Sequence, residues 1–198
     1  MASKKVLLSQ VKSNSTGNTY PQPVNGSGAQ YIYGSDLQVA YDEQSLLNIT
    51  YPTSEVIATI LWAGTNSSGT PVGAFDPSDI YAYYNATLPP YEPHAKVYGV
   101  PINGAVKPGL SATYDTTGAN CENTLDLEMT GSTAPGASIY NVYGPNSTYL
   151  SIDSAFAFIL NPNSTYKALD NVSVITNSWG GTDSNNTTWF DYLQEAQA

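Results

Sequence analysis

Two acidic residues four positions apart, Glu122 and Asp126, are the side chains of this sequence best placed to do chemistry. On an α-helix, residues at i and i+4 project from the same face, so the two carboxyl groups are expected to lie close together. Close carboxyl groups push their pKa values apart, and one then holds a proton while the other is ionised. Such a pair can act as acid and base without histidine. Taken by itself, the spacing fits two solvated acids on an exposed helix better.

The composition excludes several other kinds of chemistry. The 198 residues include one histidine, His94, and one cysteine, Cys121. This excludes an internal disulfide framework and zinc sites that need two imidazoles or several thiolates. The formal net charge of -10 excludes the clustered positive charge that nucleic-acid binding requires. No apolar run approaches the roughly 18 residues of a membrane span. We interpret His94 as a packing or surface residue and Cys121 as a small buried one.

The surface chemistry favours a secreted protein in an acidic environment. Charged residues make up only 11% of the chain, against about 25% in ordinary soluble domains. At acid pH the carboxylates would be protonated and few cations would remain to repel one another. A mildly acidic protein secreted at neutral pH is the alternative. An extracellular glycoprotein is also indicated by many Asn-x-Ser/Thr sequons, which begin at Asn14, Asn25, Asn48, Asn66, Asn85, Asn146, Asn163, Asn171, Asn185 and Asn186.

Short apolar runs alternate with helical patterns beyond residue 30. The predicted strands span 56–62, 96–102, 137–143 and 172–176, and the predicted helices begin at Asp76 or cover 121–130, 151–160 and 188–198. The alternation predicts an α/β fold, a doubly wound parallel sheet with right-handed crossovers and functional residues at the carboxyl ends of the strands. The sheet is expected to be incomplete, since a helix comes last. Turn-forming residues predict a polar linker, or the end of a propeptide, over 1–29, followed by one domain over 30–198.

The predicted helix over 121–130 carries the acidic pair, and its other side chains predict how it sits. Leu125 and Met129 lie at helical spacing on a neighbouring face and are expected to anchor the helix to the sheet. Glu128 is expected to point away from the pair and to be solvated.

The acidic pair and its flanking segments together resemble the sedolisin family of serine-carboxyl peptidases, in particular its kumamolisin-like members. The matching segments are Glu122-x-x-x-Asp126, then Ala134-Pro135-Gly136-Ala137 before a strand, then Ser178-Trp179-Gly180-Gly181 after a later strand. A further segment, Tyr33-Gly34-Ser35-Asp36-Leu37-Gln38-Val39-Ala40-Tyr41, is similar to the start of the family's mature enzyme. The resemblance covers residues 31–198.

The resemblance implies a subtilisin-like fold and a role for each matching residue. Glu122 stands where the family has the general base that takes the proton of the nucleophilic serine. Asp126 stands where the family has the acid that orients and supports that glutamate. Ser178, Trp179 and Gly180 correspond to the segment that pairs in extended fashion with the substrate backbone. A glutamate base implies proteolysis of peptide substrates at acid pH, in an extracellular setting.

The sequence departs from the family in ways that limit this expectation. The nucleophile motif Gly-Thr-Ser and the oxyanion motif Gly-Asp-Ser-Gly are both missing, so the chain is expected to be the N-terminal part of the peptidase domain and inactive alone. Its partners would be a peptide substrate and the C-terminal part of the domain. The family's calcium site would lie in that part, so no cofactor or metal is expected here. Leu61 and Trp62 occupy the region where many members have a further glutamate.

A second interpretation is a non-catalytic extracellular glycoprotein or surface-layer module on the same fold. The sequons and the missing serine motivate it. The two interpretations differ in one respect: only the first requires the Glu122 carboxyl group.

Overall fold

The computed structural model describes residues 33–179 and 187–197. The predicted linker over 1–29 lies outside these residues. Every predicted strand is confirmed to within one residue at each end, and the predicted helices are also found. The elements are α1 (Gly34–Ala40), α2 (Gln44–Leu47), β1 (Val56–Trp62), α3 (Pro77–Thr87), β2 (Lys96–Pro101), η2 (Leu110–Tyr114), α4 (Ala119–Thr133), β3 (Ser138–Gly144), α5 (Tyr149–Leu160), η3 (Ser164–Asn171), β4 (Val172–Asn177) and α6 (Thr187–Ala196).

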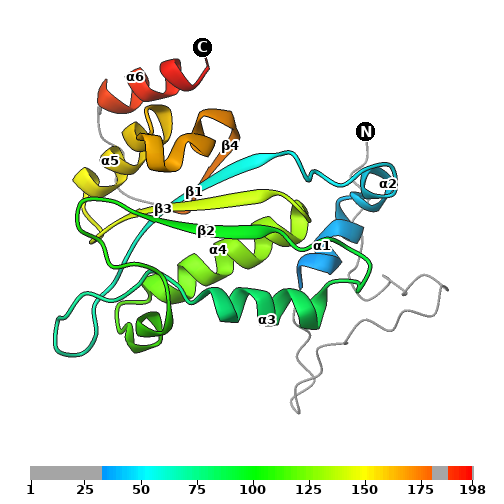
Figure 1. Ribbon diagram of the computed structural model, residues 1–198, viewed down its shortest axis with the longest axis horizontal. Helices are drawn as coiled ribbons and strands as arrows, with labels where there is room; N and C mark the ends of the chain where they lie inside the picture. The colour runs from blue at the N-terminus through cyan, green and yellow to red at the C-terminus, as the bar shows by residue number, and fades with distance from the viewer. Residues whose placement is uncertain (1–32, 180–186, 198) are drawn as a thin grey trace, which may run out of the picture.

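The strands form one four-stranded, all-parallel sheet in the order β2-β3-β1-β4. Figure 1 shows this sheet as the middle layer, with α3 and α4 on one side and α5 and α6 on the other. Successive side chains of β1 divide between the two faces: Ile57 packs with the α3/α4 cluster, whereas Ala58 and Ile60 pack with the α5 cluster. The prediction of an α/β fold with a parallel sheet and helices on both faces is therefore confirmed.

The prediction that every crossover is right-handed is wrong. The connections through α3 and α4 lie on the same face of the sheet, but the first moves from β1 outward to β2 and the second moves back to β3. Two crossovers on one face that run in opposite directions have opposite hands. The connection through α5 runs in the same direction as that through α4 but on the opposite face, so it shares the hand of the α3 connection. The β2-α4-β3 unit thus differs in hand from the other two, although about 98% of such units are right-handed.

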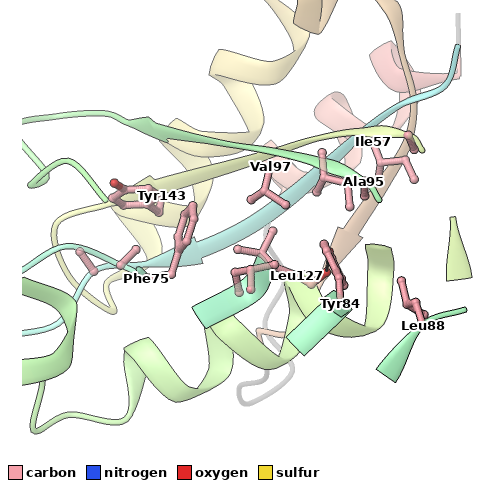
Figure 2. Packing of buried hydrophobic residues seen from close by; sticks show 13 residues of the cluster. Ile57, Phe75, Tyr84, Leu88, Ala95, Val97, Leu127 and Tyr143 are labelled. Atoms are coloured by element: carbon pink, nitrogen blue, oxygen red, sulfur yellow. Dashed lines mark hydrogen bonds between the residues drawn. The ribbon is translucent and has the colours of Figure 1, made fainter. Parts of the chain in front are cut away.

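Helix α4 is held against the sheet by the residue spacing Asn123, Leu127 and Gly131, all of which are buried. Figure 2 shows Leu127 and Tyr84 between this helix, α3 and the sheet. The Tyr84 hydroxyl donates a 2.6 Å hydrogen bond to the Leu127 carbonyl. A Cβ at Gly131 would overlap that hydroxyl, so glycine allows the two helices to approach.

The predicted anchoring of α4 by Leu125 and Met129 is wrong. Leu125 is 47% exposed and Met129 is only half-buried, whereas Leu127 has no exposed surface. Helical periodicity allows either face to be the buried one when both carry apolar residues. The choice is made by the fit of Leu127 and Gly131 against α3 and the sheet.

The free long side of β4 forms one edge of the sheet within the described residues. Val174, on the α3/α4 face of this strand, is 52% exposed. On the other face a groove of about 540 Å³ runs between β4, α5 and α6, and its walls include Ile175, Phe156 and Trp189. An edge strand with unpaired backbone groups is a template for another strand.

Candidate active site

The first turn of α4 is fixed by a carboxylate that precedes it. Gly118, the residue before the helix, adopts a left-handed conformation with φ 88° and has no side chain to cap the free N–H groups. Asp115 supplies the cap instead, since its carboxylate accepts 3.0 Å hydrogen bonds from the backbone N–H groups of Thr117 and Asn120. Burial raises the pKa of Asp115, but these hydrogen bonds outweigh it and lower the pKa below its ordinary value. The start of α4 is therefore anchored independently of the acidic pair.

The acidic pair lies where the carboxyl ends of β1 and β4 meet α4. Glu122 is half-buried in the first turns of α4, and Asp126 is half-buried one turn later. The hydroxyl of Ser178, the first residue after β4, donates a 2.8 Å hydrogen bond to Asp126 Oδ1. Two segments separated by 52 residues in the sequence are thus brought together at the carboxyl ends of the strands. Functional residues of parallel α/β folds commonly lie there.

The surroundings of the pair raise the pKa of Asp126 above its ordinary value. Burial of the carboxyl group is the main cause that raises its pKa, the negative charge of Glu122 raises it further, and the hydrogen bond from Ser178 lowers it. The structure gives the Glu122 carboxylate no hydrogen-bond partner within 33–179 and 187–197. An arrangement with one carboxyl held by a hydroxyl and its neighbour left open suits proton exchange with a third group.

Two tryptophans contact each other where β1 and β4 end, and Trp179 packs against the cluster on the α5 face of the sheet. The Trp62 ring, at the end of β1, contacts the Trp179 ring with centroids 4.6 Å apart and an interplanar angle of 63°. The Trp179 Nε1 atom is buried and has no hydrogen-bond partner in the part of the chain that the structure describes. The Trp62 indole ring is therefore in contact with the Trp179 ring rather than with another acidic side chain. Gly180, the last residue of the predicted substrate-binding segment, lies outside the described residues.

The sequence did not predict the burial of three side chains near the pair correctly. Two were assigned the wrong environment, and the third was not singled out. Glu128 was expected to be solvated but is half-buried, and burial, assisted by the charge of Asp79, raises its pKa to about 7. Cys121 was expected to be buried but is exposed. Asn123, which no motif singled out, is fully buried under the pair. Its spacing of four and eight residues from Leu127 and Gly131 was the available signal.

The described residues contain no group of three or more His, Cys, Asp or Glu side chains arranged to hold a metal ion. The expectation that no cofactor binds here stays a prediction. No described helix combines the length and apolar character needed to cross a membrane.

No protein-family model matches this chain, and no curated protein matches it either. The resemblance to the serine-carboxyl peptidases therefore depends on the motifs and on the geometry that joins them.

Replacing Ser178 with alanine is expected to raise the pKa of Asp126 further, because the hydrogen bond that stabilises the carboxylate is lost. Carbon-detected NMR titration of the Asp126 carboxyl group would measure it. Ser173→Ala is the matched control, because the Ser173 hydroxyl donates a hydrogen bond to the Glu55 carboxylate near the other end of β4. This variant should leave the Asp126 pKa unchanged. An unchanged pKa in the Ser178 variant would show that the contact does not form in solution.

Proposed function

We propose that this chain supplies the acid/base half of a serine-carboxyl peptidase of the sedolisin type, on the N-terminal part of a subtilisin-like domain. The observation that carries the proposal is the 2.8 Å hydrogen bond between Ser178 and Asp126. It joins the two motifs on which the family resemblance depends.

In the proposed mechanism, Glu122 is the general base that takes the proton of a serine nucleophile. Asp126 lies one helical turn away, and its raised pKa means that it binds a proton more tightly than an ordinary aspartate, so the two carboxyl groups would share one proton. This sharing would orient the Glu122 carboxyl group and stabilise the proton that it accepts. The segment 178–180 would pair with the backbone of an extended peptide, and the ring of its Trp179 would be held by contact with Trp62.

The nucleophilic serine and the oxyanion aspartate would come from the C-terminal part of the peptidase domain. The free long side of β4 and the groove beside it are the surfaces that suit such a partner, because added strands would extend the sheet there. An extracellular, acidic setting is proposed from the composition. The exposed sequon asparagines agree with it, namely Asn48, Asn85, Asn146, Asn163 and Asn171.

The substitution Glu122→Gln in a polypeptide that also carries Gly-Thr-Ser and Gly-Asp-Ser-Gly tests the proposal. Loss of a general base is expected to reduce kcat by roughly 10²- to 10⁴-fold near pH 3, measured by cleavage of an unstructured protein substrate. Cys121→Ser is the matched control, since it changes an exposed neighbour on the same helix and should leave kcat unchanged. The 198-residue chain alone is expected to show no peptidase activity.

The second candidate is a non-catalytic extracellular glycoprotein or surface-layer module, favoured by the exposed sequon asparagines. Under this alternative, Glu122→Gln leaves every biological function intact. Full activity of the Glu122→Gln enzyme, or acid proteolysis by the isolated chain, would reject the proposed division of the catalytic residues.

A further inference from the structure

A layer of polar side chains lies directly beneath the acidic pair, between α4 and the sheet. Its members are Asn123 of α4, Asn141 of β3 and Thr59 of β1, each with at most 1% of its surface exposed. Thr59 and Asn141 are paired in register on neighbouring strands, so both side chains project from the same face toward α4. Polar layers in such positions are costly unless every group is hydrogen-bonded.

Asn123 is the centre of this layer. Its amide nitrogen donates to the carbonyl of Trp62 at 3.0 Å, at the end of β1, and to the carbonyl of Ala119 at 2.6 Å. Its carbonyl oxygen accepts a 2.8 Å hydrogen bond from the amide of Asn141. One side chain therefore ties the first turn of α4 to both central strands of the sheet.

The hydrogen bonding of this polar layer is incomplete, which is unfavourable for stability. Asn141 Oδ1 and Thr59 Oγ1 have no hydrogen-bond partner among the residues that the structure describes, although both atoms are buried. The apolar neighbours of the layer, Leu127 and Ile139, show that the same interface accepts hydrocarbon side chains. A contact that only held the helix in place would gain more from apolar side chains throughout.

These hydrogen bonds complete a closed series of contacts that runs from α4 to β1, on to β4, and back to Asp126 on α4. Asn123 links α4 to the carbonyl at the end of β1, and β1 pairs with β4 up to Ile60 and Asn177. Ser178 follows at once and returns to α4 through Asp126. Asp115, Leu127 and Tyr84 also hold α4, but Asn123 is the side chain that ties it to the end of β1. Losing this link is therefore expected to loosen the position of α4 relative to the end of β4 and to weaken the Ser178–Asp126 hydrogen bond.

We propose that Asn123, supported by Asn141, is a positioning residue that sets the place of the Glu122/Asp126 pair relative to the segment after β4. The catalytic value of this role rests on the proposed function. The hydrogen bonds that define the role do not depend on it. The Asn123 side chain makes its hydrogen bonds to Trp62, Ala119 and Asn141 and none to either acidic side chain, so it acts through the backbone of β1 and the position of α4.

The test is an NMR titration of the Asp126 carboxyl group in the 198-residue chain and its variants, with the free energy of unfolding measured in urea. Asn123→Ala is expected to raise the Asp126 pKa in the same direction as Ser178→Ala, since both remove or weaken the same hydrogen bond. Asn141→Ala leaves the bonds of Asn123 to backbone in place. It is expected to shift the Asp126 pKa in the same direction by less, and it keeps the test valid if Asn123→Ala does not fold.

Ile152→Ala is the control for a general loss of stability, because this buried residue lies in α5 on the opposite face of the sheet. It should destabilise the chain and leave the Asp126 pKa unchanged. If the Asn123 or Asn141 variant, when folded, loses stability without any change in that pKa, the layer is only structural and the proposal is overturned. The titration does not measure proteolysis. The positioning role of Asn123 can therefore be confirmed or rejected whether or not the peptidase proposal is correct.

Discussion

Replacing Leu127 with alanine is expected to lower the free energy of unfolding by about 3 kcal/mol, within the range of roughly 2–5 kcal/mol for a buried leucine. Leu127 has no exposed surface and packs with Tyr84, Ile139 and their neighbours between α4, α3 and the sheet (Figure 2). Truncation leaves a cavity that the surrounding strands and helices fill only in part. Urea denaturation followed by tryptophan fluorescence would measure the loss.

Leu125 provides a matched control on the same helix. It lies only two residues away but is 47% exposed, so Leu125→Ala is expected to change stability by less than about 0.5 kcal/mol. The prediction would be contradicted by equal losses in the two variants, or by a larger loss at Leu125. Either result would mean that α4 is rotated about its axis relative to the structure.

The free energy of unfolding is expected to increase as the pH falls from about 8 to about 5. Burial raises the pKa of several carboxyl groups, most of all Glu128, from its ordinary 4.5 to about 7; the others are Glu43, Glu92 and Asp126. A group with a raised pKa binds its proton more tightly in the folded state. Its stabilising effect is full below the ordinary pKa and is lost as the pH rises through the folded pKa.

Asp115 acts in the opposite sense. Its pKa is lowered, so its contribution is present above the ordinary value of 3.8 and is lost as the pH falls through the lower, folded value. Stability is therefore expected to be highest at about pH 4–5. This maximum is more acidic than that of most proteins, and it agrees with the proposed acidic setting.

Glu128→Gln tests the main contributor. The variant is expected to be more stable than the original chain at pH 8 by roughly 1–2 kcal/mol, after allowance for the part of the side chain that contacts water. It should also lose most of the pH dependence between about pH 5 and 8. Thermal and urea unfolding across this range would measure both effects. Glu195→Gln removes the same charge from an exposed position on α6 and serves as the control. An unchanged pH profile in the Glu128 variant would contradict the assignment.

Much of the local structure followed from residue patterns. The β-branched run over 56–62 could form little other than a buried strand, and Asp76 followed by Pro77 specified a helix start that the structure realises, with Asp76 accepting a hydrogen bond from the N–H of Ser78. The spacing of Glu122 and Asp126 likewise placed both on one helix. These features depend on contacts within a few residues, which a sequence displays directly.

The sequence by itself thus determined the strands, the helices and which residues could form an acid/base pair. Only the tertiary structure decided that Asp126 meets Ser178, that Asn123 rather than Leu125 faces the sheet, and that Glu128 is half-buried. The reason is that these outcomes depend on where α4 lies, and α4 belongs to the one crossover whose hand differs from the others. Hand and helix rotation are settled by packing between segments far apart in the chain, and no local pattern encodes them.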